Sequence, residues 1–344
     1  MASARPHTVI PRVRRRFSIP FIVATSAVAS VLLAACGSSG GASAAGNSSG
    51  GSSASAGSSA GTIGFLSFWT GGDPFATALA QATLAEGKKL GVTIDYVDGN
   101  NNLSAQIGAI QDFITKRVKA IVVFPGNATA LIPIVNKAAA AGIPVIDLNE
   151  QLSSGAKLYT YVGDNDYTYG QLEAKALVKA LNGKGTFALA EGTIGYAATN
   201  NRTAGIESVL KNYPNIHMVA EQSDNFKNSQ ALALTQDWAT KYPSLNAIVF
   251  EGPEGYIGGQ WAVKHGHGNV KFIVGDYPTY VASAIKAGEV YAAVDQSPIL
   301  EAQDSVKAAY DVATGQGNKV PKPAWYISLP VITKANVNTI KPAW

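Results

Sequence analysis

Cysteine is almost absent from this chain, because Cys36 is the only one among its 344 residues. No disulfide can form within the chain, so a hydrophobic core must supply the stability of the fold. Histidine is nearly as rare, with four residues. Two of them, His265 and His267, are close in sequence, but no third ligand accompanies them. We therefore expect no metal site.

The chain also lacks an excess of charge of one sign when its first 36 residues are not counted. The formal net charge is +4, but five arginines and no acidic residue lie in the first 36 positions. The remaining chain has 22 basic and 23 acidic residues, a net charge of −1. A nearly neutral body lacks the electrostatic surface that binds phosphate backbones, so we predict no nucleic-acid partner.

Residues 1–36 have the pattern of an export signal. The arginines precede an apolar run at 17–35, which ends in Leu33-Ala34-Ala35 before Cys36. A basic start, an apolar segment and a small-residue cleavage site are typical of a secretory signal peptide. The last four residues resemble the lipobox of bacterial lipoproteins, which implies a lipid on Cys36 that attaches the protein to the cell membrane. An uncleaved membrane anchor stays open as an alternative, and so does twin-arginine instead of Sec export.

Residues 37–61 contain no apolar side chain larger than alanine. They cannot bury enough surface to offset the entropy lost on ordering. We predict that this segment is a flexible tether between the membrane and a globular body that begins at Thr62.

From Thr62 onward, predicted strands and helices alternate in two similar halves. Continuous apolar runs at 120–124 and 247–250 are typical of buried parallel strands. Asp73-Pro74 begins a predicted helix that ends near Leu90. Other expected elements are a helix capped by Ser104, a helix at 127–141, a helix from 297 to 315 and an extended segment at 325–333. The pattern predicts an α/β fold of two doubly wound parallel-sheet lobes that share an interlobe cleft.

Motifs for catalysis are missing from the globular part. Gly183-Lys184-Gly185-Thr186 precedes a predicted strand, so it indicates a turn and not a phosphate loop. No Gly-x-Ser-x-Gly or His-Glu-x-x-His motif follows Thr62. A nucleophile with a base and an orienting group cannot be assembled. We therefore predict that the protein is not an enzyme.

Six sequence motifs support a family. They are Thr62-Ile63-Gly64-Phe65-Leu66, Asp73-Pro74-Phe75, Lys89-Leu90-Gly91, Ala141-Gly142-Ile143-Pro144-Val145-Ile146, Gly163-Asp164-Asn165, and Asp276 with Gln296 twenty residues later. In this order, the segment from Thr62 to about Thr333 resembles the type I periplasmic binding proteins for sugars, the ribose-binding-protein-like group. The resemblance implies an N-terminal lobe of 62–163 plus 297–327 and a C-terminal lobe of 164–296 plus 328–344.

The resemblance also implies how the protein works. Three crossovers near Asp164, Gln296 and Ser328 would form a hinge that lets the lobes close on a small ligand. A monomer without a cofactor would then deliver that ligand to the permease of an ABC importer. A ligand sensor for a membrane receptor shares this fold and stays open. A repressor of the same fold would need a DNA-binding motif where this chain has its signal.

Candidate ligand-binding residues follow from the chemistry of sugars. Aromatic planes pack on the apolar faces of a sugar ring, and charged or amide groups bind its hydroxyls. The resemblance implies stacking by Phe75 and Phe226, for which core packing is the alternative. Helix capping is the alternative for Asp73, and hinge hydrogen bonding for Gln296. The predicted set is Trp69, Asp73, Phe75, Asn149, Glu150, Asn200, Phe226, Glu254, Asp276 and Gln296.

Departures from the family pattern restrict the class of ligand that the site is expected to bind. Asn149-Glu150 stand where these proteins usually have Asp-Arg, and Asn200 stands where an arginine is common. Glu254 lies beside Gly252-Pro253, which replace an Asn-Asp pair. The site thus loses donors and gains carboxylates, which only accept hydrogen bonds when ionised. This disfavours anions and favours a neutral sugar or polyol, with a cationic or amino-substituted solute as the alternative.

Overall fold

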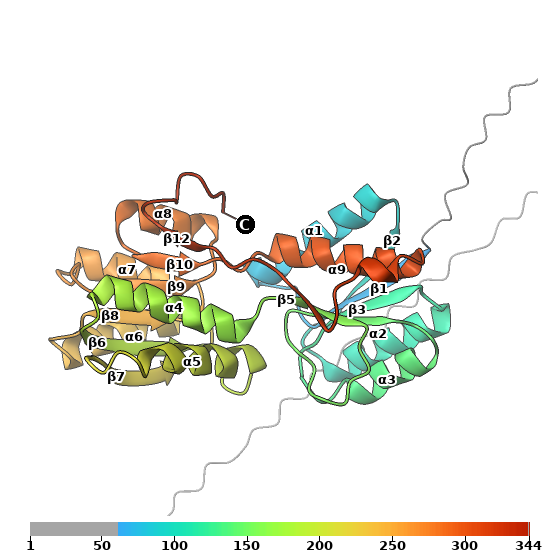
Figure 1. The fold of residues 1–344 in the computed structure, drawn as a ribbon, viewed down its shortest axis with the longest axis horizontal. Coiled ribbons are helices and arrows are strands. Elements are labelled where there is room, and N and C mark those ends of the chain that lie inside the picture. Colours follow the sequence, from blue (N-terminus) through green and yellow to red (C-terminus); the bar gives the residue numbers. More distant parts are fainter. Residues whose placement is uncertain (1–60, 343) are drawn as a thin grey trace, which may run out of the picture. The chain divides into compact units, whose positions relative to one another are not determined.

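The computed structural model describes residues 61–342 and residue 344 (Figure 1). The predicted signal peptide at 1–36, the lipidation site Cys36 and all but the last residue of the tether lie outside these residues. Within the described part of the chain, no helix combines the length and the apolar character that a membrane crossing requires.

The first sheet has six strands in the order β11-β5-β4-β3-β1-β2, and all its pairings are parallel. Its strands are β1 (Thr62–Ser67), β2 (Thr93–Asp98), β3 (Ala120–Phe124), β4 (Val145–Leu148), β5 (Thr160–Gly163) and β11 (Ala324–Tyr326). Alternate residues of β3 belong to two different hydrophobic clusters. This sheet therefore packs helices on both of its faces.

Four helices cover the first sheet. They are α1 (Pro74–Leu90), α2 (Leu103–Lys116), α3 (Ile132–Ala140) and α9 (Pro298–Ala313), with a short 3₁₀ turn η1 (Gly317–Lys319) after the last. α1 packs beside α9 on one face, and α2 packs beside α3 on the other. α9 comes late in the sequence and yet completes the first lobe, because the chain returns to it.

The second sheet repeats this plan in the order β12-β10-β9-β8-β6-β7. Its strands are β6 (Gly185–Glu191), β7 (Ile216–Ser223), β8 (Ala247–Phe250), β9 (Lys271–Gly275), β10 (Ala292–Val294) and β12 (Val331–Thr333). Only β12 runs antiparallel to its neighbour. The helices are α4 (Asp166–Leu181), α5 (Ala197–Leu210), α6 (Asn228–Lys241), α7 (Gly255–Lys264) and α8 (Thr279–Ala287). α4 and α5 cover one face, and the other three cover the opposite face.

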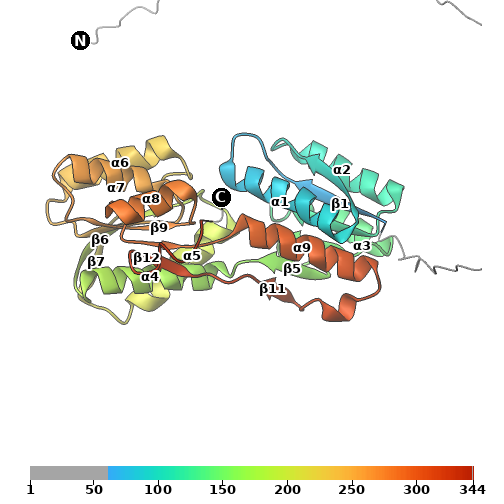
Figure 2. The ribbon, with the colours of Figure 1, turned by 90° about the horizontal axis from the view of Figure 1, so that it is seen from above.

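The chain passes three times between the two sheets (Figure 2). It leaves the first sheet after β5 and enters α4 beside the second. It returns between β10 and α9, and it crosses again in the four residues between β11 and β12. The two predicted lobes are therefore each built from segments that are distant in sequence.

Several predicted elements need correction. The helix expected at 127–141 begins only at Ile132, because the Asn127 side chain accepts hydrogen bonds from the N–H groups of Thr129 and Ala130 and closes a turn. Asn102, and not Ser104, caps α2. The expected extended segment at 325–333 is divided between β11 and β12, which pair with different sheets.

Candidate functional site

The predicted site residues gather where parallel strands end. Asn149 and Glu150 follow β4, and Asp276 follows β9. Glu254 lies in the turn between β8 and α7, and Asp73 lies between β1 and α1. Ligands of open α/β sheets bind beyond the carboxyl ends of the strands. Both sheets thus offer their polar side chains at the edge where a ligand is expected.

Asp73 caps α1, as the sequence predicts. Its Oδ1 accepts hydrogen bonds from the backbone N–H groups of Phe75 at 2.8 Å and Ala76 at 3.3 Å. Desolvation raises the pKa of Asp73 in spite of these two bonds. Its charge also contributes to the raised pKa of Asp276 in the second lobe. Carboxyl groups of both lobes therefore share one electrostatic environment.

Asp276 has an unusual backbone that fixes its side chain at the end of β9. Its φ of 53° is left-handed, and its N–H donates to Tyr169 Oη at 2.8 Å. The preceding Gly275 is needed here, because a Cβ would lie 2.3 Å from the carbonyl oxygen of Glu251. Desolvation raises the pKa of Asp276 to about 7. Near neutral pH its carboxyl group can therefore donate or accept a hydrogen bond.

The side chains of Phe226 and Glu254 both pack against Gly252 in the second lobe. A Cβ on Gly252 would lie 2.6 Å from Glu254 Oε2 and 2.7 Å from Phe226 Cδ1, so both side chains pack against it. The Phe226 ring also covers Gly192, and the residue is 36% exposed. Its φ of 54° is left-handed, like those of Asp276 and Asn149. Such backbone strain is concentrated at functional sites in many proteins.

Arg202 of α5 lies at the centre of a buried polar network. Its Nε donates to Asp166 Oδ1 at 2.9 Å, and its Nη1 donates to the Glu251 carbonyl at 2.9 Å. Its guanidinium lies 3.9 Å from the ring centroid of Tyr169 and 3.7 Å from Asp164 Oδ2. The sequence predicted a structural role for this arginine and no contact with the ligand. The arginine forms an ion pair with Asp166 and lies near Asp164, the two acidic residues at the first crossover.

Close packing of α4 and α5 makes this network possible. A Cβ on Gly170 would lie 1.9 Å from the Arg202 carbonyl oxygen, and a Cβ on Gly205 would lie 2.2 Å from the Tyr167 carbonyl oxygen. Only glycine at both positions allows the two helix backbones to approach this closely. The approach brings the guanidinium of Arg202 within reach of Asp166.

Gln296 extends the network into the first lobe. Its Oε1 accepts from Arg202 Nη2 at 2.7 Å, and its Nε2 donates to Glu301 Oε1 at 2.8 Å. Glu301 Oε2 in turn accepts from Asn149 Nδ2 at 2.8 Å. The side chains of Gln296 and Asn149 therefore belong to one hydrogen-bonded network with Arg202 and Glu301. Desolvation raises the pKa of Glu301 to about 8. The sequence prediction did not include Glu301.

Glu150 lies near the start of α5. Desolvation raises its pKa to about 7, the negative charge of Asp166 adds to this effect, and Arg202 and the backbone N–H of Ala198 oppose it. Its charge also contributes to the raised pKa of Tyr196, the residue that precedes α5. Glu150, which follows β4 of the first lobe, therefore lies close to the first turn of α5 in the second lobe.

None of the side-chain hydrogen bonds described above involves Trp69 or Asn200. The Trp69 ring packs on the first lobe's core, with its centroid 6.5 Å from that of Phe68. Asn200 is exposed on the first turn of α5, and its backbone N–H donates to the Tyr196 carbonyl. The structure adds Tyr280 of α8, because Asp276, Glu254 and Asp73 all contribute to its raised pKa after desolvation.

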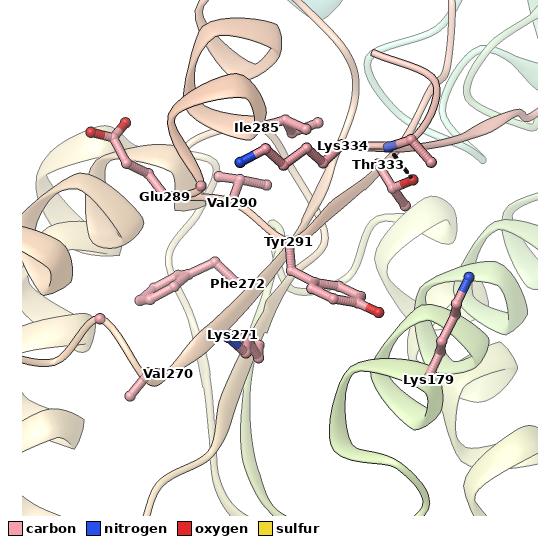
Figure 3. Close-up of a pocket in the computed structure, with 13 residues that line it drawn as sticks. Lys179, Val270, Lys271, Phe272, Ile285, Glu289, Val290, Tyr291, Thr333 and Lys334 are labelled. Atoms are coloured by element: carbon pink, nitrogen blue, oxygen red, sulfur yellow. Dashed lines mark hydrogen bonds between the residues drawn. The ribbon is translucent and has the colours of Figure 1, made fainter.

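A separate pocket lies at the amino ends of strands in the second sheet, away from the carboxyl ends where the predicted site residues lie (Figure 3). Its volume is about 370 Å³, and Lys271, Tyr291 and Lys334 are among its lining residues. Lys271 begins β9 and Tyr291 precedes β10, so the pocket lies at the amino ends of these strands. None of the predicted ligand-binding residues lines it. In the described part of the chain, no cluster of three or more His, Cys, Asp or Glu side chains could hold a metal ion.

Comparison with known proteins identifies the family. A family model described as "Periplasmic binding protein domain" matches residues 63–317. This chain therefore belongs to the periplasmic binding protein family. Membership implies an extracytoplasmic protein that binds a solute and is not an enzyme.

Individual relatives agree with the family match. The chain is 27% identical over 249 residues to a xylitol-binding protein of Mycolicibacterium smegmatis, covering 72% of this chain and 70% of that one. It is 29% identical over 276 residues to a putative rhizopine-binding protein of Rhizobium meliloti, covering 77% and 88%.

Solved structures show the same fold. An ABC transporter periplasmic solute binding protein from Actinobacillus succinogenes with bound D-allose superposes with a TM-score of 0.74 at 27% identity, covering 81% of this chain and 99% of that one. An ABC transporter solute binding protein from Bacillus halodurans with bound myo-inositol gives a TM-score of 0.74 at 25% identity, covering 82% and 97%. These neighbours confirm the predicted class of two parallel-sheet α/β lobes.

Proposed function

We propose that this protein captures a neutral sugar or polyol between its two lobes and delivers it to the permease of an ABC importer. The observation that carries the proposal is that Asp73 in the first lobe and Asp276 in the second both lie beyond the carboxyl ends of their strands, where the charge of Asp73 contributes to the raised pKa of Asp276. Phe75 lies beside Asp73, and Phe226 packs with Glu254 against Gly252. Each lobe thus contributes both an acidic group and an aromatic ring.

The acidic groups suit hydroxyl ligands. A hydroxyl donates and accepts hydrogen bonds, and a carboxyl group whose pKa is about 7, as in Asp276, does the same near neutral pH. Burial, together with the nearby charge of Asp224, raises the pKa of Glu254 well above its usual range. An anion would be repelled by the ionised carboxyl groups, because the guanidinium of Arg202 is already bound to Asp166 and Gln296. Xylitol, D-allose and myo-inositol, named for the relatives, are all neutral polyhydroxy compounds.

The N-terminus supports a proposal for where capture takes place. We propose that residues 1–36 are a signal peptide, that Cys36 carries the lipid, and that 37–61 tether a monomeric body to the membrane. The N-terminal lobe of this body would consist of residues 62–163 and 297–327, and the C-terminal lobe of residues 164–296 and 328–344. The distribution of β11 and β12 between the two sheets supports this division.

A thermal-shift screen tests the ligand class. The full-length chain in detergent is heated with xylitol, myo-inositol, D-allose or D-ribose, and with spermidine and glucosamine as cationic probes. At a hundredfold excess over Kd, a ligand that binds only the folded state should add about 2.7 kcal/mol of stability. Ribose 5-phosphate is the matched anionic control and should give no shift. Stabilisation by spermidine or ribose 5-phosphate alone would overturn the proposal.

A further inference from the structure

Trp344, the final residue of the sequence, lies between helices of different lobes (Figures 1 and 2). Its ring centroid is 5.9 Å from that of Phe75 in α1, and the two planes meet at 88°. The centroid is also 6.2 Å from that of Tyr280 in α8, and those two planes meet at 89°. Both are edge-to-face contacts, the geometry that aromatic pairs favour.

The backbone of Trp344 is held by the second lobe. Its carbonyl oxygen accepts hydrogen bonds from the N–H of Thr279 at 2.7 Å and from Thr279 Oγ1 at 2.9 Å. Thr279 begins α8, and the preceding Pro278 gives no side-chain cap. The Trp344 carbonyl thus satisfies an N–H group that the helix itself leaves unpaired. The ring is therefore placed by α8.

The segment that leads to Trp344 is anchored in the same lobe. Tyr277 Oη donates hydrogen bonds to the carbonyl oxygens of Val337 and Ile340, each at 3.2 Å. Val337 is buried in the core cluster of the second sheet. Trp344 thus belongs to the second lobe through its backbone and reaches the first lobe through its ring.

The indole of Trp344 carries an unsatisfied donor. Its Nε1 is buried and has no hydrogen-bond partner among the described residues. A buried donor without a partner destabilises the folded state, so a ligand atom that accepts from it would be favoured. Both rings that Trp344 contacts lie near predicted ligand-binding residues. The charges of Asp73 and Asp276 act on Tyr280, and Phe75 follows Asp73 by two residues. This donor lies next to the proposed ligand site.

We infer that Trp344 is a ligand-binding residue, which packs its ring on the bound sugar or polyol and donates its indole N–H to one of the ligand's oxygens. The inference rests on the proposed function and adds a residue that the predicted set does not contain. Phe75 is the only aromatic residue of α1, and the next residue, Ala76, is a buried methyl group. Trp344 supplies the second ring at this side of the site.

The inference is tested by three variants of the full-length chain. Trp344→Ala removes the ring and the donor, and Trp344→Phe keeps a ring without the donor. Lys341→Ala, at an exposed position of the same segment, is the matched control. All three keep the backbone carbonyl that binds Thr279, so α8 stays anchored. Affinity for xylitol, myo-inositol and D-allose is measured by calorimetry, and the melting temperature without ligand checks folding.

We expect Trp344→Ala to weaken binding about tenfold or more, because it loses aromatic contact as well as a hydrogen bond. Trp344→Phe should weaken it about three- to tenfold, the value of one hydrogen bond. Lys341→Ala should bind as the wild type does.

Two other results overturn the inference and are distinguishable. If the wild type binds and Trp344→Ala binds equally well or more tightly, the ring is a bystander or a plug, and the proposed function survives. If the wild type binds no sugar or polyol, the proposed function fails and the inference fails with it.

Discussion

Arg202 donates a hydrogen bond of 2.7 Å from its Nη2 to Oε1 of Gln296, and this bond joins α5 to the crossover that precedes α9. Through Gln296 the bond continues to Glu301 in the first lobe. The same guanidinium neutralises Asp166. A single cation therefore connects the second lobe with two of the three crossovers.

Replacing this cation should be costly. Arg202→Met leaves buried carboxylates without their partner, so we expect a loss of about 3–5 kcal/mol in the free energy of unfolding. Urea denaturation measures the loss. The matched control is Lys211→Met, an exposed residue just after α5, which should change stability by less than about 0.5 kcal/mol. A loss below about 1 kcal/mol in Arg202→Met would show that the acidic groups do not need the arginine.

Stability should fall as the pH rises from about 4 to about 8. Desolvation raises the folded-state pKa of Asp276, Asp295 and Glu251 to about 7, while the unfolded chain has ordinary values near 4. The folded state therefore binds more protons within this window. Its stabilisation is complete below the unfolded pKa and is lost as the pH rises through the folded pKa. Urea denaturation at pH 5, 6, 7 and 8 measures the slope.

Asp295→Asn isolates one group of this set, because burial alone raises the pKa of Asp295. The variant should lose stability with pH less steeply than the wild type, by at most about 1.4 kcal/mol per pH unit below pH 7. Asp237→Asn, on the exposed face of α6, should leave the slope unchanged. Equal slopes in the wild type and Asp295→Asn would contradict the assignment.

Asp276→Asn should weaken sugar or polyol binding by one order of magnitude or more. Asparagine tolerates the left-handed φ of this position, so the fold should persist while a hydroxyl partner is changed. Phe75→Ala should have a similar effect, because it removes a stacking surface. Calorimetry with the best ligand of the screen measures both variants, and Asp237→Asn is the control. Unchanged affinity in both variants would show that the site lies elsewhere.

Cys36→Ala should release the protein from the membrane fraction. A lipid needs the cysteine thiol, whereas an uncleaved apolar segment does not. Fractionation of cells that express the full-length chain separates these cases. Ser38→Ala, two positions later, is the control and should stay with the membrane. If Cys36→Ala also stays there at full length, the proposed lipid anchor is wrong.

Much of the fold could be predicted, since its signals are local. Asp73-Pro74 capped α1 as expected, and the buried apolar runs of β3 and β8 formed the predicted parallel strands. Boundaries failed where a side chain competed with the helix. Asn127 is such a case, because its side chain binds the N–H groups that would otherwise begin the helix.

The site could be predicted only where a residue follows its strand directly, as Asp276 does. Glu301 was missed, because an acid in the first turn of a helix normally serves the helix dipole and gives no sign of burial. Arg202 was interpreted as a structural residue, and its network depends on Gly170 in α4 as well as on Gly205 in its own helix. Trp344 was missed, since only tertiary packing brings it to Phe75.

The place of Trp344 gives the molecule a built-in optical reporter. Indole emission depends on its surroundings, and this indole is fastened to one lobe while its ring touches the other. The chain has four further tryptophans. Once these are replaced by phenylalanine, the colour of the remaining emission would follow the opening and closing of the protein around its solute, with no dye attached.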